Sequence, residues 1–197
     1  MRHGLNLIFR NNIIQYLVYS NDVQVGAQYY LTKTDNGYTI SDKIYYDSNG
    51  HVLKRSHWYP NGNLDEIWEY KKGEPHGIFR KRYYNGNLWQ AGKYNKGDKT
   101  GKWFVWYENR QITRVARYVN DTKCGEETIW HENGQVWRKG YYDHDTKIGT
   151  WTSWHDNGKK EMEGSYSNGK KQGEWRCWNE DGSLKETVRY NEGKKIH

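Results

Sequence analysis

The chain has 197 residues and a formal net charge of +7, and only 34% of its residues are hydrophobic. This composition excludes a thick aliphatic core, and no stretch approaches the roughly 20 apolar residues of a membrane-spanning helix. Disordered chains are poor in aromatic residues, whereas this one contains 18 Tyr and 11 Trp. We therefore expect a folded protein whose core consists of large flat side chains.

The N-terminal segment, residues 1–36, has strand-like runs without a regular spacing. The runs "IIQYLVY" and "VQVGAQYYL" are rich in β-branched and aromatic residues. We expect this segment to be a divergent β cap, because the terminal units of repeat proteins are usually atypical. The short apolar run "LNLIF" does not resemble a signal-peptide core, and Cys124 and Cys177 are too few for a disulfide framework. We expect a cytoplasmic protein. Attachment to a membrane surface is left open, as is a location in the host cytoplasm or in a virion if the protein is viral.

Residues 37–197 repeat with a period of 24. Tyrosines, glycines, tryptophans and Asn-Gly pairs all recur at this interval. Several such columns in phase indicate a repeat protein of about six units and a terminal half unit. The tyrosine column comprises Tyr46, Tyr70, Tyr94, Tyr118, Tyr142, Tyr166 and Tyr190.

Each unit contains two runs of strand length. In one unit, residues 135–142 and 149–155 are separated by a polar loop and followed by Asn157-Gly158. Asn-Gly between such runs predicts a hairpin with a two-residue type I′ turn, in which both central residues have positive φ. The predicted fold is all-β, an elongated, twisted, single-layer antiparallel meander of tandem 24-residue β-hairpin repeats.

The predicted turn fixes the register of each hairpin. If Asp156 pairs with Lys159, Trp151 lies opposite Gly164 and Tyr166 lies opposite Gly149. We expect each of these rings to cover the glycine opposite it. The same arithmetic places Trp154 opposite Glu161, Trp130 opposite Trp137, Trp106 opposite Thr113, Trp178 opposite Lys185 and Arg82 opposite Trp89.

Strand alternation places one column of tryptophans on the other face of the sheet. A flat aromatic and basic face suits binding a helix or an extended segment of a partner protein. The tryptophans of this column can also serve only to cover a sheet that lacks a second layer. The candidate binding residues are Trp89, Trp106, Trp130, Trp137, Trp154, Trp178, Arg80 and Arg176.

Lysines are concentrated in the polar loops and are expected to project from one long edge of the sheet. Such an edge would attract anionic lipid headgroups or nucleic-acid phosphates, or would only keep the sheet in solution. Lys123 and Lys147 lie in the equivalent loops, 24 and 48 residues after Lys99. The candidate anion-binding residues are Lys71, Lys72, Lys96, Lys99, Lys170, Lys171, Lys194 and Lys195.

The pair His155-Asp156 has the residue types of a catalytic site, but equivalent positions hold Tyr107-Glu108 and Asn179-Glu180. We therefore expect no catalytic residues. His131 and His155 are expected to lie about 9.6 Å apart, two strand spacings, which is too far for a shared metal ion. We expect no metal and no cofactor. Arg110 replaces the glycine of the other turns, either by drift or as a functional arginine.

The stretches "AGKYNKGDKTGKW" (91–103) and "EGSYSNGKKQGEW" (163–175) resemble the MORN repeat. The 24-residue unit with its added "WxxNG" half is similar to the MORN-variant repeats of bacterial antitoxin-like proteins and of large-virus proteins. The resemblance implies a non-enzymatic scaffold that binds a protein partner. It also leaves open an antitoxin or immunity protein that neutralises a toxin by direct binding, a peripheral anionic-lipid-binding protein, a virion-associated structural protein and end-to-end self-association. We do not expect nucleic acid to be a partner.

Overall fold

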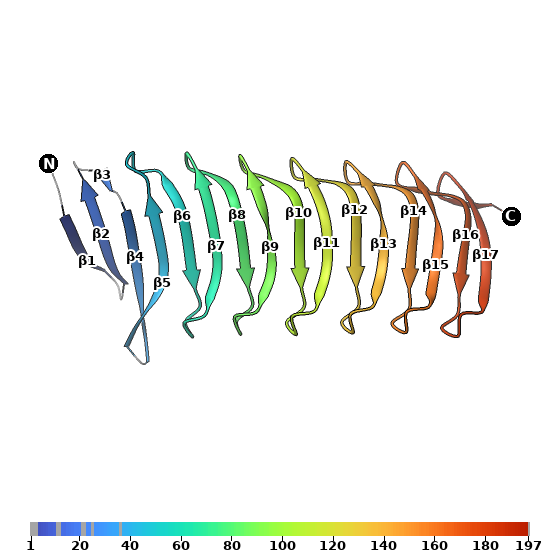
Figure 1. The fold of residues 1–197 in the computed structure, drawn as a ribbon, viewed down its shortest axis with the longest axis horizontal. Helices are drawn as coiled ribbons and strands as arrows, with labels where there is room; N and C mark the ends of the chain where they lie inside the picture. Colours follow the sequence, from blue (N-terminus) through green and yellow to red (C-terminus); the bar gives the residue numbers. More distant parts are fainter. Residues whose placement is uncertain (1–3, 11–12, 21–22, 25, 36, 197) are drawn as a thin grey trace. The chain divides into compact units, whose positions relative to one another are not determined.

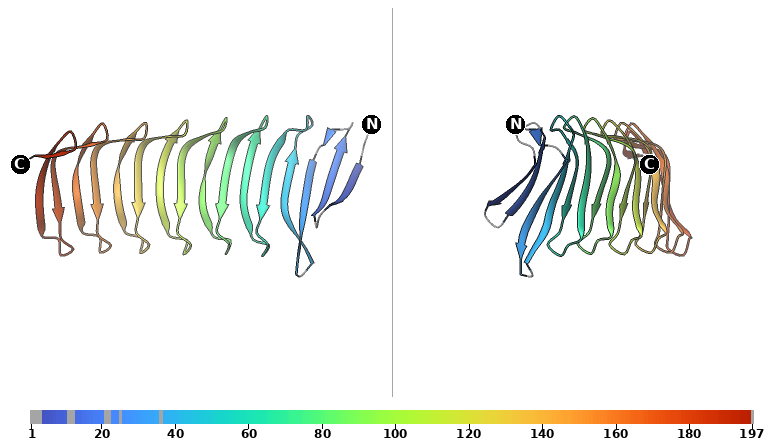
Figure 2. Two further views of the ribbon diagram at one scale, coloured as in Figure 1. Left: turned by 180° about the vertical axis from the view of Figure 1, so that it is seen from behind. Right: turned by 60° about the vertical axis from the view of Figure 1, so that its left-hand side comes forward.

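The computed structural model describes residues 4–10, 13–20, 23–24, 26–35 and 37–196, which form strands and turns and contain no helix (Figure 1). The chain divides into two compact units, Met1–Asp98 and Lys99–His197. Within each unit, most consecutive strands are joined by hairpins and pair antiparallel in a single layer (Figures 1 and 2). The prediction of an all-β antiparallel meander of hairpins is confirmed.

The described residues of the first unit form nine complete strands. Residues 13–19 of the predicted cap lie in β2, and β4 pairs with both β2 and β5, so this segment continues the meander of its unit. Residue 25, within the second predicted strand run, lies outside the described residues. The strands are β1 (Gly4–Arg10), β2 (Ile13–Ser20), β3 (Val23–Gln24), β4 (Gly26–Thr34), β5 (Gly37–Tyr46), β6 (Val52–Trp58), β7 (Leu64–Lys71), β8 (Glu74–Arg82) and β9 (Leu88–Asn95).

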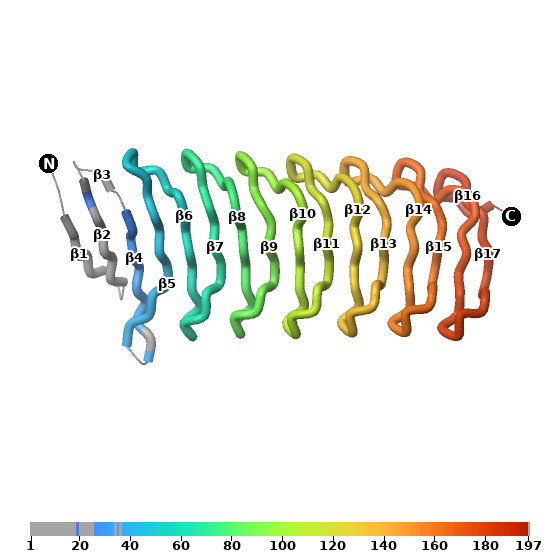
Figure 3. Tube along the Cα trace, in the orientation of Figure 1, coloured from blue at the N-terminus to red at the C-terminus, as the bar shows by residue number. Residues whose placement is uncertain are grey.

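The second unit repeats the hairpin with little variation, as the Cα trace shows (Figure 3). Its first strand, β10, begins at Asp98, the last residue of the first unit. The strands are β10 (Asp98–Trp106), β11 (Ile112–Val119), β12 (Thr122–Trp130), β13 (Val136–Asp143), β14 (Thr146–Trp154), β15 (Lys160–Ser167), β16 (Lys170–Trp178), β17 (Leu184–Asn191) and β18 (Lys194–Ile196).

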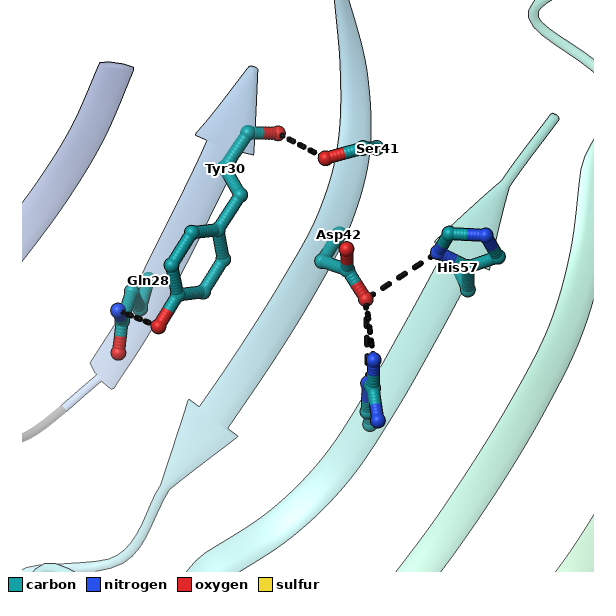
Figure 4. A network of polar contacts seen from close by, with 6 residues as sticks. Gln28, Tyr30, Ser41, Asp42 and His57 are labelled. Atoms are coloured by element: carbon teal, nitrogen blue, oxygen red, sulfur yellow. Dashed lines mark hydrogen bonds and ion pairs between the residues drawn. The ribbon is translucent and has the colours of Figure 1, made fainter. Parts of the chain in front are cut away.

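A polar network joins β4, β5 and β6 in the first unit (Figure 4). The buried Gln28 amide bonds to the Tyr30 hydroxyl and accepts a hydrogen bond of 2.8 Å from the Tyr46 hydroxyl. Asp42 Oδ1 lies 2.9 Å from Arg55 Nη2 and 3.2 Å from His57 Nδ1. This part of the first unit is therefore held by polar contacts between side chains as well as by its strand pairing.

The turns at the two ends of the hairpins differ. Asn168-Gly169 forms a two-residue turn between Ser167 and Lys170 with φ of 48° and 77°, as a type I′ turn requires. At Asn157-Gly158 only the glycine has positive φ, 80°, and Gly158 N donates to His155 O at 2.9 Å. This is a type I turn followed by a left-handed glycine. The predicted type I′ turn at Asn157-Gly158 is therefore wrong. Type I′ turns occur instead at the opposite end of the hairpins, as at Asn168-Gly169.

The predicted register is correct along most of each hairpin and wrong next to this turn. Trp151 pairs with Gly164 and Gly149 with Tyr166, as predicted, but Trp154 pairs with Lys160 rather than Glu161. The turn contains three residues, 156–158, instead of the predicted two, and this shifts the pairing of Trp154 by one residue. A bulge between Ser153 and Trp154 returns the rest of the hairpin to the predicted register. The same correction pairs Trp106 with Ile112, Trp130 with Val136, Trp178 with Leu184 and Arg82 with Leu88.

The core of the second unit is a column of tryptophans on one face, which we call the sealed face. Trp103, Trp151 and Trp175 are only 3%, 3% and 2% exposed. A Cβ placed on Gly164 would lie 2.2 Å from Cδ2 of Trp175, and one on Gly140 would lie 2.1 Å from Cδ2 of Trp151. The indoles of Trp151 and Trp175 therefore pack on the glycine of the preceding strand.

The expected covering of glycine by the ring directly opposite is thus incorrect. The ring over Gly164 belongs to Trp175, although the register partner of Gly164 is Trp151. Gly149 has a positive φ of 62°, and a Cβ placed there would have no atom within 4 Å, so Tyr166 does not cover it. Gly149 is required for its backbone conformation instead.

Lysine side chains complete the sealed face. Lys147 Nζ lies 4.5 Å from the ring centroid of Trp151 and 5.0 Å from that of Tyr166. Lys171 stands in the same way between Trp175 and Tyr190, at 4.3 and 4.9 Å. Each ammonium thus contacts two aromatic rings, an attractive arrangement that covers the tryptophan layer without a second sheet.

Candidate partner-binding face

The opposite face of the second unit, which we call the open face, carries Trp106, Trp130, Trp154 and Trp178. These tryptophans follow the sealed-face column at a spacing of three residues, which strand alternation places on the other side. All four are half-buried, whereas the sealed-face tryptophans are almost fully buried. The Trp106 ring stacks on Phe104 with 5.8 Å between ring centroids.

Side chains from the preceding turn hold the backbone of these tryptophans in place. His131 Nε2 lies 2.9 Å from the Trp154 carbonyl and His155 Nε2 lies 3.0 Å from the Trp178 carbonyl. The Tyr107 hydroxyl donates to the Trp130 carbonyl at 3.0 Å. The two histidines therefore take the place of a tyrosine that links one hairpin to the next. This structural role explains why either Tyr or His can occupy these positions.

A hollow of about 600 Å³ lies on the open face over β10–β13. Its apolar lining comes from Phe104, Val115, Trp130 and Val136. Three cationic side chains and one carboxylate stand around these groups. The charged residues are Lys102, Arg117, Lys139 and Glu126.

One of these cations is already neutralised within the hollow. Lys139 Nζ lies 3.0 Å from Glu126 Oε2, and the Tyr141 hydroxyl donates to the same carboxylate at 3.2 Å. The hydrogen bond from Lys139 is the main cause that lowers the pKa of Glu126. Glu126 therefore stays ionised at neutral pH and balances Lys139.

The structure brings only some of the predicted aromatic residues together. Trp130 lines the hollow and Trp106 stacks beside its Phe104, whereas Trp154 and Trp178 lie on later hairpins. Trp137 is 41% exposed and contacts His131 and Arg138. Arg176 forms an ion pair of 2.7 Å with Glu174.

Two predicted residues belong to the first unit. Trp89 is 40% exposed, with its ring 6.0 Å from that of Tyr83 and 5.5 Å from Lys81 Nζ. Arg80 is exposed on β8. Both side chains are accessible to solvent.

The lysines of the expected edge divide into two groups. Lys71, Lys72 and Lys96 are exposed and line a hollow of about 270 Å³ together with Glu74 and His76. Lys170, Lys194 and Lys195 are also exposed, and Lys170 Nζ forms an ion pair of 2.9 Å with Glu192.

The second group does not project into solvent as expected. Lys99, Lys123, Lys147 and Lys171 are half-buried and lie over aromatic rings of the sealed face. Burial is the main cause that lowers the pKa of Lys147, followed by repulsion from Arg138. Long aliphatic stems allow lysine to fold back along apolar surface, which strand alternation alone does not reveal.

Glu127 interrupts the sealed-face column of tryptophans. It is only 2% exposed, and its Oε1 lies 2.7 Å from Lys123 Nζ. Its place in the column, 24 residues from both Trp103 and Trp151, is visible in the sequence, but our sequence analysis did not use it. A buried carboxylate at a core position is the clearest residue that the sequence reading missed.

One group of side chains has the chemistry of a metal site. Atoms of Cys124, Asp143 and His144 lie within 4.8 Å of one another, and thiolate, carboxylate and imidazole are all zinc ligands. His144 Nδ1 is hydrogen-bonded to Asp143 Oδ1 at 2.7 Å. A bound ion would have to replace this hydrogen bond and take further ligands from water.

Four segments of the chain match the family model of the MORN repeat variant, residues 53–72, 123–144, 147–168 and 171–192. In the second unit each match begins at a lysine of the sealed face and ends at the first residue of a type I′ turn. These matches support a MORN-repeat protein. A comparison with curated proteins gave no match. The described part of the chain offers no helix of the length and apolar character needed to cross a bilayer.

Proposed function

We propose that this MORN-repeat chain is a non-enzymatic scaffold that binds a protein partner through the open face of its second unit. The difference between the two faces supports this proposal. The sealed face buries its tryptophans almost completely under lysine and tyrosine side chains. The open face keeps four half-buried tryptophans at a regular spacing.

The regular spacing argues against a purely structural role for the open-face tryptophans. One aromatic layer already supplies the buried core of this unit. A second row of large aromatic side chains on the other face leaves apolar surface in contact with water, which is unfavourable unless a partner covers it. Tryptophan is also enriched among the residues that dominate binding energy at protein interfaces.

The positions of the histidines support a scaffold rather than an enzyme. His131 and His155 bond to backbone carbonyls of the next hairpin, so their ring nitrogens serve the repeat itself. An antitoxin or immunity protein would use the same face to bind its toxin. Such a protein is a special case of this proposal, as is a structural protein of a virion.

Peripheral binding to anionic lipid is a second candidate function. The exposed Lys71, Lys72 and Lys96 around a hollow of the first unit favour it. Each lysine close to an anionic membrane contributes about 1 kcal/mol. This attraction is screened by salt, whereas burial of aromatic side chains is not.

Affinity capture with the full chain, followed by mass spectrometry, tests the proposal. The double variant Trp130→Ser/Trp154→Ser should lose the captured partner, and the complex with the unmodified chain should survive 1 M salt. The matched control Tyr38→Ser/Tyr84→Ser removes two exposed rings of the first unit, 52% and 58% exposed, and should retain the partner. Circular dichroism establishes that each variant is folded.

Vesicles of phosphatidylserine and phosphatidylcholine test the second candidate. Binding to phosphatidylserine that disappears at 1 M salt and in Lys71→Gln/Lys72→Gln/Lys96→Gln would support lipid attachment. A partner that the Trp130→Ser/Trp154→Ser chain retains would refute binding through the open face.

A further inference from the structure

Two cations face each other at the rim of the open-face hollow. Lys102 on β10 is the direct register partner of Arg117 on β11, and both residues are exposed. Among the described residues, no ion pair joins either side chain to a carboxylate. Like charges directly opposite each other destabilise an antiparallel pair.

Equivalent positions in the other hairpins of the second unit avoid this repulsion. Glu126 pairs with Tyr141, which donates a hydrogen bond to it. The next two hairpins have Thr150 opposite Ser165 and Glu174 opposite Arg189. The three repeats thus serve as internal controls, and the like-charged pair is particular to the hairpin that borders the hollow.

One of the two apolar pairs in the hollow, Phe104 with Val115, is particular to the same region. Phe104 lies opposite Val115, and Trp130 lies opposite Val136. At the positions equivalent to Phe104 and Val115, the later hairpins have Thr152 with Glu163 and Arg176 with Thr187. Positive charge without a carboxylate partner and apolar surface therefore lie side by side in this hollow.

We propose that this hollow binds a short segment of a partner protein with an acidic side chain next to an apolar one. The carboxylate would lie between Lys102 and Arg117, and the apolar side chain would pack on Phe104 and Trp130. This inference rests on the proposed function and names the chemistry of the partner.

Three physical features favour this occupant. A carboxylate between the two cations would turn their repulsion into two charge-assisted hydrogen bonds, and the arginine can bind it with two parallel N–H groups. Phe104 and Trp130 supply the contact area of an aromatic anchor. The volume of about 600 Å³ lies within the usual range of ligand pockets, roughly 300–1,000 Å³.

Selection from a random library of displayed 12-residue peptides against the full chain tests the proposal. The selected peptides should be enriched in Asp or Glu within two positions of Leu, Ile, Phe or Trp. A synthetic, labelled copy of the strongest binder should lose at least tenfold in affinity with Lys102→Glu/Arg117→Glu, measured by fluorescence anisotropy. Changing its acidic residues to Asn or Gln should have a similar effect.

Two further variants make the result specific. Lys194→Glu/Lys195→Glu changes the net charge by the same amount on exposed residues of β18 and should retain the peptide. Lys102→Gln/Arg117→Gln removes the charges without reversing them and should lose about tenfold, which covers the case in which charge reversal disturbs the fold. Phe104→Ser should also weaken binding, through the apolar contact.

Four outcomes would overturn the inference. They are selected peptides without acidic residues, peptides that bind the charge-reversed chain equally well, a library that yields no binder, and anionic vesicles as the only ligand that depends on Lys102 and Arg117. A captured partner that depends on Trp154 and Trp178 but not on Lys102 and Arg117 would leave the proposed function standing and refute this inference alone.

Discussion

Ala116 and Glu127 lie opposite each other in β11 and β12, where the next two hairpins place a glycine beneath a tryptophan ring. A Cβ on either of those glycines, Gly140 or Gly164, would overlap the indole above it. The methyl group of Ala116 occupies this space, so a tryptophan cannot fit at position 127. The two departures from the repeat are therefore one coupled feature.

We predict that Glu127→Trp lowers the free energy of unfolding by about 1–3 kcal/mol, because the indole overlaps the Ala116 methyl group. In Ala116→Gly/Glu127→Trp the ring can lie as Trp151 does, with Lys123 over it as Lys147 lies over Trp151. The double variant should therefore be more stable than Glu127→Trp alone, with a coupling energy of about 0.5–3 kcal/mol. Guanidinium denaturation of the four chains of this cycle measures the coupling. Additive effects would contradict the coupling of the two sites.

Arg110 adopts a left-handed backbone conformation, φ 74°, where equivalent turns have Gly134 and Gly158 at 88° and 80°. A side chain in this region costs roughly 1–2 kcal/mol that glycine avoids. Arg110→Gly should therefore raise the free energy of unfolding by about 1 kcal/mol, and Gly134→Arg should lower it by a similar amount. Thermal denaturation tests both. A less stable Arg110→Gly chain would mean that contacts of the arginine side chain outweigh the strain.

The raised pKa values of four tyrosines lead us to expect a loss of stability at alkaline pH. Burial is the main cause that raises the pKa of Tyr59 to about 12 and also raises the pKa values of Tyr70, Tyr142 and Tyr166. Between pH 10 and about 12, a tyrosine that is ionised in the unfolded chain remains protonated in the folded one. The unfolded state then binds fewer protons, so the free energy of unfolding falls as pH rises through this window.

Lys147 acts in the opposite direction, because its lowered pKa makes the folded state bind fewer protons just below pH 10.5. The four tyrosines outnumber it, and we expect a net decrease in stability above pH 10. Tyr59→Phe should reduce the slope of this decrease, measured by urea denaturation at several pH values. An unchanged slope in Tyr59→Phe would contradict the assignment to Tyr59.

Lys102→Glu should stabilise the chain while it weakens peptide binding. The substitution places a carboxylate opposite Arg117, as Glu174 lies opposite Arg189, and should add about 0.2–1 kcal/mol to the free energy of unfolding. Glu174→Lys is the reverse change, since it creates a like-charged pair with Arg189 and also removes the ion pair with Arg176, and it should be destabilising. Loss of stability in Lys102→Glu would show that the lysine has a structural role.

The sequence predicts the repeat, the strand pairing and the two faces because these follow from the 24-residue period and from strand alternation. The turn at Asn157-Gly158 could not be predicted in the same way, because this dipeptide suits two turn types. Here Asn157 Oδ1 accepts from Lys159 N at 2.9 Å, and its Nδ2 donates to Glu180 O in the next hairpin at 2.8 Å. A contact with the neighbouring hairpin thus accompanies a turn that local rules leave open.

The candidate site was predictable only in part, for a similar reason. The column of open-face tryptophans follows from alternation, but the hollow depends on Phe104, Val115 and Lys102, which belong to no repeated column. Residues that depart from a repeat are visible in the sequence. Which of them are neighbours depends on a register that the bulges alter near each turn.

The three-residue turn shifts the pairing of β14 and β15 by one residue, and the bulge at Glu161 shifts it back. Deletion of Glu161, the unpaired residue of the bulge, would therefore keep Trp151 opposite Gly164, whereas deletion of a paired residue such as Thr152 would move Trp151 out of register with Gly164. Point insertions and deletions within a strand are accordingly penalised, while duplication or loss of a whole 24-residue segment preserves every pairing. Such a chain is expected to diverge in evolution through the number of its hairpins and the side chains they display, with hairpin length held constant.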